Sequence, residues 1–117
     1  MMGPAVAAMR SLPGNRWEFD LLLSPDHPAF KGHFPGVPVL PGVVQLDWAV
    51  RLADAHLGID LGAAQNFQVK YQRVIQPTPR GATLALTWDR PRAALHFVYT
   101  VAGATASSGR ITLPARP

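Results

Sequence analysis

The feature that most constrains this chain is a stretch rich in proline and glycine at residues 24–42. It holds five prolines and three glycines. Proline locks the backbone and lacks an N–H group, so neither a helix nor a central strand continues through such a stretch. A long loop without regular structure is uncommon in a small domain unless it carries function. We therefore expect a rigid, functional loop between the N-terminal part of the chain and the rest.

The residues that follow this loop predict a helix over 42–57. Pro41 suits a helix start, because the N–H that it lacks would have no partner there. Gly58 suits the end of the helix. Apolar residues recur at helical spacing on one side and also occupy much of the other (Val43, Leu46, Val50, Ala53 and Leu57; Val44, Trp48, Leu52 and Ala55). A helix with apolar residues around most of its axis is expected to be buried nearly all round.

Alternation of apolar and polar side chains predicts strands on both sides of this helix. It is clear at 17–23, 67–71, 84–88 and 95–101, and weaker at 107–113. Turn-forming residues mark 77–81 and 89–91. Residues 1–14 contain Pro4, Pro13 and Gly14 and are expected to form a loosely ordered terminus.

The order of elements predicts one α+β domain over residues 1–117. One strand precedes the helix, and about four consecutive strands follow it. Consecutive strands with short connections pair antiparallel. A single apolar helix against such a sheet predicts a curved sheet wrapped around a central helix.

Composition narrows the classes of function. There is no cysteine, which excludes disulfides, thiolate catalysis and cysteine metal sites, and no group of residues has metal-ligand spacing. The net charge is +4, which favours an acidic partner, although a charge that serves only solubility is the alternative. The basic residues are scattered without a nucleic-acid motif. No apolar run is long enough for a membrane span, so we expect a soluble cytoplasmic protein.

Two titratable residues lie in settings that suit catalysis. His33 is in the rigid loop, and Asp47 is in the predicted buried helix, where a carboxylate is costly unless it is paired or functional. Arg51 follows Asp47 by four residues and precedes Asp54 by three, so it can pair with either. The alternative for these three residues is a small ion-pair network on an exposed strip of helix.

The loop and the helix start together resemble a known signature. Residues 27–43 run His-Pro-x-Phe-x-Gly-His-Phe-Pro-Gly-Val-Pro-Val-Leu-Pro-Gly-Val, and Asp47 follows His33 by fourteen residues. This pattern is similar to that of the FabA/FabZ-type 3-hydroxyacyl-acyl-carrier-protein dehydratases, which have the hot dog fold. The acid at this spacing is Asp in the FabA type and Glu in the FabZ type, so Asp47 matches the FabA type. The short length of the chain is closer to the FabZ type. The chain particularly resembles the small dehydratases of aryl-polyene gene clusters.

The resemblance implies a reaction and a role for each site residue. It implies reversible dehydration of a 3-hydroxyacyl thioester to a trans-2-enoyl thioester, without a cofactor, in fatty acid, polyketide or polyene biosynthesis. His33 would remove the C2 proton, with its ring oriented by the backbone carbonyl of Val39. Asp47 would protonate the leaving hydroxyl. The backbone N–H of Gly42, at the helix N-terminus, would stabilise the thioester oxygen.

The resemblance also implies partners. The acyl group would arrive on acyl carrier protein, an acidic partner for which Lys31, Lys70, Arg73 and Arg80 are candidate contacts. A two-fold dimer would build each site from His33 of one chain and Asp47 of the other. The dimer would contain two copies of this chain, or this chain and another hot dog subunit.

One position departs from the family pattern. The family usually has Gln four residues after the acid, and this chain has Arg51. A cation beside Asp47 favours its charged form, which opposes the role of acid. Two alternatives to the active dehydratase therefore stay open: a weakly active or inactive hot dog subunit that pairs with an active one, and an acyl-thioesterase on the same fold.

Overall fold

The computed structural model describes residues 2–31 and 36–114. Its strands are β1 (Ala5–Leu12), β2 (Arg16–Leu23), β3 (Asn66–Tyr71), β4 (Thr78–Asp89), β5 (Ala94–Val101) and β6 (Ala104–Thr112). A 3-10 turn, η1 (Pro28–Phe30), lies in the proline-rich loop. The helix α1 (Gly42–Leu52) continues into the π-helical turn η2 (Ala53–Leu57). The predicted helix bounds of 42–57 are therefore confirmed.

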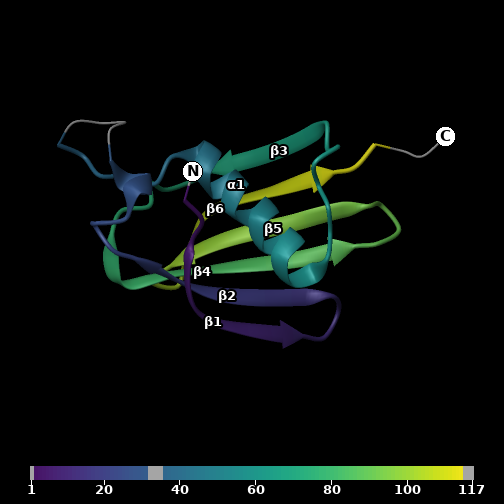
Figure 1. Cartoon of the computed structure of the whole chain (residues 1–117), viewed down its shortest axis with the longest axis horizontal. Helices are drawn as coiled ribbons and strands as arrows, with labels where there is room; N and C mark the ends of the chain where they lie inside the picture. The colour runs from purple at the N-terminus through teal and green to yellow at the C-terminus, as the bar shows by residue number, and fades with distance from the viewer. Residues whose placement is uncertain (1, 32–35, 115–117) are drawn as a thin grey trace.

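The described strands form one six-stranded antiparallel sheet in the order β1-β2-β4-β5-β6-β3. Figure 1 shows the sheet curving behind α1, which lies across one face of it. Alternate residues of the central strands, such as Phe19, Leu84 and Phe97, point to this face and are fully buried. The expected α+β architecture, with a curved sheet around one helix, is confirmed.

The prediction of a loosely ordered N-terminus is wrong. Residues 5–12 form β1, which pairs along β2 from Ala5 with Leu22 to Leu12 with Arg16. Of the residues that we interpreted as breakers, Pro4 precedes β1, and Pro13 and Gly14 lie in the hairpin turn, where Gly14 and Asn15 both have positive φ (81° and 55°). Such a turn matches the twist of paired strands. The side chains of β1 are mostly exposed, which explains why no apolar alternation marked it.

The predicted turn at 77–81 is also wrong in part, because β4 already begins at Thr78. The register against β2 shifts there, since Leu21 pairs with Ala82 but Leu23 pairs with Thr78. The additional residues on β4 form a bulge, and Gly81 adopts a φ of +67° within it. Proline and glycine at this point thus bend a strand rather than end it.

The helix is buried on one face rather than nearly all round. Its buried residues are Val44, Gln45, Trp48, Ala49, Leu52 and Ala53. Val43, by contrast, is 63% exposed, and Arg51 is also exposed. The far side of α1 is exposed because a single sheet can cover only one side of a helix. Within the described residues, no helix has the length and apolar character that a membrane crossing requires.

The bulge yields a test of the fold. A Cβ at Gly81 would collide with the backbone carbonyl oxygen of Leu21, whereas a Cβ at Gly103, which also has positive φ, would meet nothing. Gly103→Ala should therefore cost only backbone strain, about 1 kcal/mol of unfolding free energy. Gly81→Ala should cost about 3 kcal/mol, because β2 and β4 must separate as well. Urea unfolding of both variants measures the difference, and equal costs would contradict the bulge geometry.

Candidate active site

A hollow of about 340 Å³ opens at the N-terminus of α1. The loop end, the helix start and the end of β3 with the residues after it line this hollow (Val39, Leu40, Pro41, Gly42, Gln45, Tyr71, Gln72, Arg73 and Val74). It therefore brings together three predicted site residues, Val39, Gly42 and Arg73. The N–H groups in the first turn of a helix have no acceptor within the helix and attract negative charge.

Hydrogen bonds within the backbone hold the start of α1. Pro41 precedes α1 in an extended conformation, and its carbonyl accepts hydrogen bonds from the N–H groups of Val44 and Gln45, at 3.0 and 3.1 Å. Glycine at position 42 is required for space. A Cβ there would lie 2.5 Å from both Cζ and the hydroxyl oxygen of Tyr71. The ring of Tyr71 thus packs directly against the backbone of Gly42.

Asp47 is one helical turn further along α1 and forms an ion pair. The Nε of Arg51 lies 2.7 Å from Oδ2 of Asp47, and the two side chains are 44% and 34% exposed. The expectation of a carboxyl in a buried position is therefore wrong for the isolated chain. The alternative interpretation, an ion pair on an exposed strip of helix, describes the contact between Asp47 and Arg51 in the single chain. The cause is that this side of α1 faces away from the sheet.

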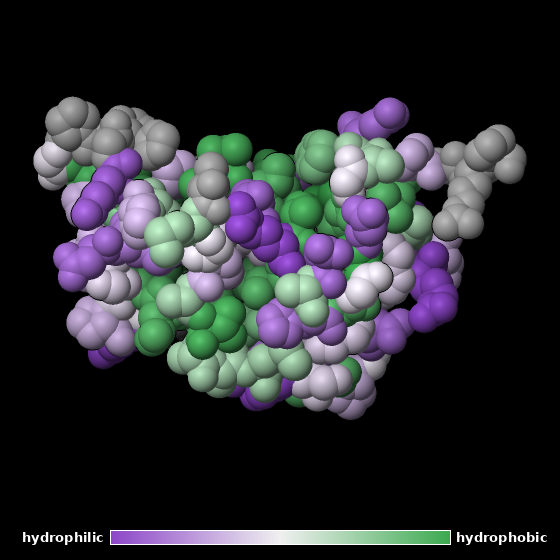
Figure 2. All heavy atoms as spheres, viewed as in Figure 1, coloured by the Kyte–Doolittle hydropathy of each residue, from purple (hydrophilic) through white to green (hydrophobic). Residues whose placement is uncertain are grey.

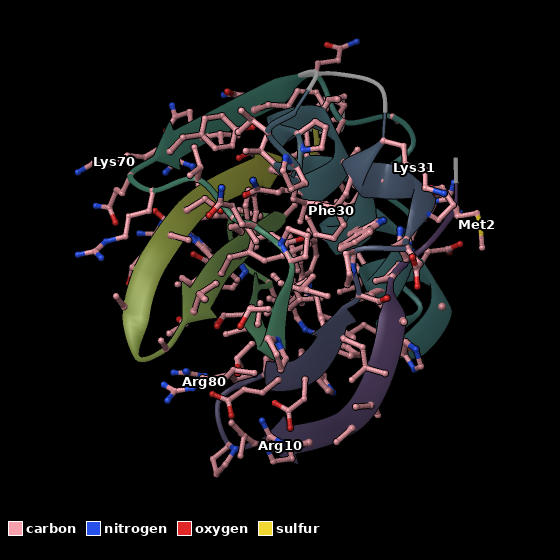
Figure 3. The ribbon with its side chains drawn as sticks, turned by 90° about the vertical axis from the view of Figure 1, so that its left-hand side faces the viewer. Met2, Arg10, Phe30, Lys31, Lys70 and Arg80 are labelled. Atoms are coloured by element: carbon pink, nitrogen blue, oxygen red, sulfur yellow. The ribbon has the colours of Figure 1, made fainter. Side chains whose placement is uncertain are left out.

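The remaining predicted site residues are His33 and the four candidate contacts for acyl carrier protein. His33 lies outside the described residues, so its meeting with Asp47 stays a prediction. Lys31, Lys70, Arg73 and Arg80 are exposed. Arg73 lines the hollow at the helix start. Figure 3 shows Lys31, Lys70 and Arg80 well apart from one another, so these three do not form a compact basic patch.

Burial changes the acidity of two phenols near this site. Partial burial raises the pKa of Tyr71. Complete burial raises the pKa of Tyr99 well above its ordinary value, and the nearby negative charge of Asp47 and the phenol of Tyr71 add to this effect. Both phenols are therefore neutral at physiological pH, where an unperturbed tyrosine is already protonated.

The sequence did not suggest the contacts that the N-terminal segment makes with α1. The indole N–H of Trp48 donates to the carbonyl of Met2 at 3.2 Å. Nδ1 of His27 accepts from the N–H of Ala29, so Nε2 carries the hydrogen and donates to the carbonyl of Gly3 at 3.0 Å. A Cβ at Gly3 would lie 3.7 Å from a guanidinium nitrogen of Arg51. The segment therefore runs beside the Asp47–Arg51 pair.

A buried polar residue, Gln45, was also missed. It is 3% exposed and hydrogen-bonds through its side chain to the carbonyl of Leu40 and to Ser107. The signal that was available is its place between Val44 and Leu46, where a polar residue interrupts an apolar helix.

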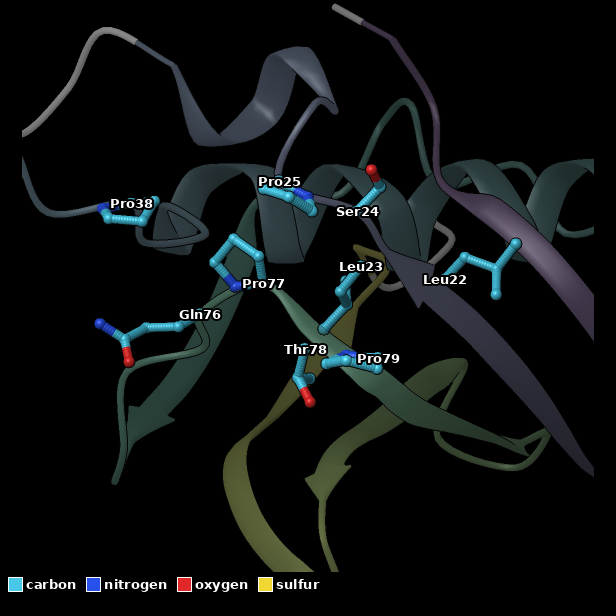
Figure 4. Close-up of a pocket in the computed structure, with 9 residues that line it drawn as sticks. All are labelled: Leu22, Leu23, Ser24, Pro25, Pro38, Gln76, Pro77, Thr78 and Pro79. Atoms are coloured by element: carbon cyan, nitrogen blue, oxygen red, sulfur yellow. The ribbon is translucent and has the colours of Figure 1, made fainter.

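A larger hollow, of about 630 Å³, lies between the end of β2 and the start of β4 (Figure 4). Leucine and proline dominate its lining, which includes Leu22, Leu23, Pro38, Pro77 and Pro79. None of the described residues that line it is titratable. The hollow suits an apolar group, but its lining cannot move a proton.

Apolar side chains also reach the surface around β3. Figure 2 shows hydrophobic groups at the top of the view, where β3 lies. Phe67 and Tyr71 of β3 are 46% and 53% exposed, and the neighbouring Val43 and Val74 are 63% and 72% exposed. In the described sheet β3 is also an edge strand. An apolar edge of this kind is typical of a surface that another chain covers.

Similar proteins agree with this architecture. Residues 9–110 match the family described as ApeI-like, ApeI dehydratase. The chain belongs to the ApeI-like dehydratase family. A FabZ 3-hydroxyacyl-[acyl-carrier-protein] dehydratase of Rickettsia felis is 32% identical over 100 residues, in an alignment that covers 74% of this chain and 67% of that protein. The predicted membership of the FabA/FabZ-type dehydratases, and with it the dehydratase activity, is thereby confirmed.

Solved structures of dehydratases support the hot dog fold. A chain of the dehydratase heterocomplex ApeI:P from Xenorhabdus doucetiae superposes with a TM-score of 0.79 at 32% identity, covering 97% of this chain and all of that one. The dehydratase domain from the terminal module of the rifamycin polyketide synthase superposes with a TM-score of 0.69 at 19% identity. It covers 97% of this chain and 44% of the domain, and it supports the fold alone.

The packing of Tyr71 on Gly42 predicts a coupling that stability measurements detect. Gly42→Ala should destabilise the protein by about 1 kcal/mol, because the ring of Tyr71 has to move away. In a Tyr71→Ala background the same change should be neutral or stabilising, since alanine favours a helix over glycine. A double-mutant cycle by chemical unfolding measures the coupling. An equal effect of Gly42→Ala in both backgrounds would show that the ring does not explain the glycine.

Proposed function

We propose that this dehydratase removes water from a 3-hydroxyacyl group carried on acyl carrier protein, through a site in which His33 and Asp47 act together. The observation that carries the proposal is the helix start. Gly42 lines a hollow at the N-terminus of the same helix that bears Asp47, and the loop with His33 leads directly into it. In this proposal the helix start and the base come from one chain, and the acid comes from Asp47 of the second chain.

Each step of the proposed reaction uses a group of this chain. The imidazole of His33, oriented by the carbonyl of Val39, takes the proton from C2. The electron pair of that C–H bond moves toward the thioester carbonyl, whose oxygen gains negative charge. The N–H of Gly42 donates a hydrogen bond to this oxygen. The electrons then form the C2–C3 double bond as the C3 hydroxyl leaves as water with a proton from Asp47.

A second candidate function is favoured by Arg51. Its guanidinium holds Asp47 in an ion pair, so the carboxyl group that the reaction needs as an acid is already engaged. A chain with a weakened acid would serve as the less active subunit beside an active dehydratase. The similar ApeI:P structure is itself a heterocomplex, which makes such a pairing a specific alternative.

A second subunit fits the apolar edge around β3. Val43, Phe67, Tyr71 and Val74 together expose apolar surface next to the hollow that holds Gly42. Pairing of two β3 edges would cover these residues and satisfy the free side of the strand. We propose that such a dimer brings His33 of one chain to Asp47 of the other, in a homodimer or with a different hot dog subunit.

Acyl carrier protein is the proposed acidic partner. Arg73 lines the hollow at the helix start, and Arg80 follows Thr78 and Pro79 of the larger hollow. Lys31 and Lys70 are exposed but line neither of these two hollows. Arg73 and Arg80 are therefore the best placed of the four candidates to meet a carrier that delivers its acyl group to either hollow.

His33 should be essential for activity. His33→Ala should lower the rate of crotonyl-thioester hydration by about 100-fold or more, the usual contribution of a general base. His96→Ala is the matched control, because His96 is on β5 and lines neither hollow described above, and it should keep wild-type activity. Free thiol is monitored in the same assay, since its release would indicate a thioesterase. Full activity of the folded His33→Ala protein would exclude the proposed base.

Subunit mixing tests the shared site. His33→Ala and Asp47→Ala proteins, each inactive, should regain activity when they exchange subunits, because one site of the mixed dimer contains both intact residues. Activity should approach half that of the wild type per mixed dimer. Native mass spectrometry verifies the exchange. Verified mixed dimers without activity would show that the two residues do not act across the interface.

A further inference from the structure

Gln45 is a polar residue buried in the first turns of α1. Its side-chain amide donates from Nε2 to the carbonyl oxygen of Leu40 at 3.0 Å. Its Oε1 accepts a hydrogen bond of 2.6 Å from the hydroxyl of Ser107 on β6. Burying an amide is costly unless its groups are paired, and here both ends of the amide have a partner. The chain therefore maintains this polar contact inside an otherwise apolar core.

The contact holds the Leu40–Pro41 peptide group of the loop, and a second hydrogen bond holds the Val39–Leu40 peptide group before it. The N–H of Leu40 donates to the carbonyl of Ile75 at 2.7 Å, and its carbonyl accepts from Gln45. Leu40 is thus tied on one side to the connection between β3 and β4, and on the other side to the helix. The hydroxyl of Ser107 sets the direction of the amide, because an amide turned by 180° would place an acceptor against the Leu40 carbonyl.

Leu40 lies between the two residues whose backbone groups the proposed reaction uses. Val39 precedes it, and Gly42 follows Pro41. Because peptide groups are planar and Pro41 has a locked φ, the orientation of the Leu40 carbonyl limits the orientation of its neighbours. We propose that Gln45 is a positioning residue for the dehydratase, which holds the Leu40 carbonyl so that the Val39 carbonyl and the Gly42 N–H keep their catalytic directions. This inference rests on the proposed function of those two groups.

Tyr99 provides a control within the same buried cluster. Its hydroxyl donates to the backbone carbonyl of Gln45 at 2.7 Å, and it is fully buried. Tyr99→Phe removes one buried hydrogen bond to the same residue but leaves the Gln45 amide and Leu40 untouched. Both Tyr99→Phe and Gln45→Leu should lower the melting temperature. Only Gln45→Leu should disturb the Leu40 peptide.

Steady-state kinetics with an enoyl or 3-hydroxyacyl thioester on acyl carrier protein test the inference. Gln45→Leu should lower kcat about tenfold or more, since small misplacements of catalytic groups cost that much. KM should change less than about twofold, because distant binding contacts remain. Tyr99→Phe should keep kcat within about twofold of the wild type. Equal losses of kcat in the two folded variants would show that Gln45 contributes stability only.

A conservative variant adds a readout that a structural role would not produce. In Gln45→Glu, a protonated carboxyl still donates to the Leu40 carbonyl and accepts from Ser107, whereas an ionised one repels that carbonyl. The ratio of its kcat to that of the wild type should therefore rise as the pH falls. The titratable groups nearby are Asp47 on the same helix, Tyr99 on β5, and Tyr71 and Arg73 at and after the end of β3, and all are present in the wild type. Circular dichroism at each pH verifies folding, and a ratio independent of pH would overturn the inference.

The result separates this inference from the proposed function. If His33→Ala is fully active, the proposed site is wrong whatever Gln45 does. If His33→Ala is inactive while Gln45→Leu and Tyr99→Phe behave alike, the site stands and only the positioning role of Gln45 fails.

Discussion

The packing of one face of α1 against the concave sheet is the interaction on which the rest of the structure depends. Trp48, Ala49 and Ala53 have no exposed surface, and they meet strand residues that are equally buried. Burial of such side chains contributes roughly 1.5–3 kcal/mol for each large one. Because the helix is fixed along its length, its N-terminus has a definite place at the end of the proline-rich loop. The hollow with Gly42 exists for this reason.

The same packing leaves the opposite side of α1 without a cover. Asp47 and Arg51 lie on that side and pair with each other, and Val43 is exposed near the start of the helix. The apolar edge around β3 adjoins this region. An isolated chain therefore carries its proposed acid on a half-open surface. The proposed second subunit would supply what the single sheet does not, namely apolar cover and the partner histidine.

Polar contacts refine what apolar packing determines only coarsely. Leucine and tryptophan hold α1 against the sheet without specifying the direction of a peptide group, because the hydrophobic effect is not directional. Hydrogen bonds are directional. The links from Gln45 to Leu40 and from Leu40 to Ile75 determine how the loop enters the helix. The proposed oxyanion site lies two residues beyond Leu40, where this precision matters for a backbone donor.

Local periodicity by itself predicted the strands that became β2 to β6, the helix from residue 42 to 57 and the loop before it. Pro41 and Gly58 act through their own backbones, so they mark the helix ends in any tertiary setting. The motif around His33 likewise identified the family from neighbouring residues. These features depend on contacts within a few residues, which a sequence displays directly.

Only the tertiary structure decided which surfaces meet. β1 is a strand because β2 is beside it, and the segment at Gly81 is a bulge because β4 pairs with β2 there in a shifted register. Asp47 is half-exposed because a single sheet covers only one side of α1. Gln45 has its partners because Leu40 and Ser107, five residues before it and sixty-two after it, converge on one buried point. Such contacts depend on how distant segments pack, and that information is not present in the pattern of any one segment.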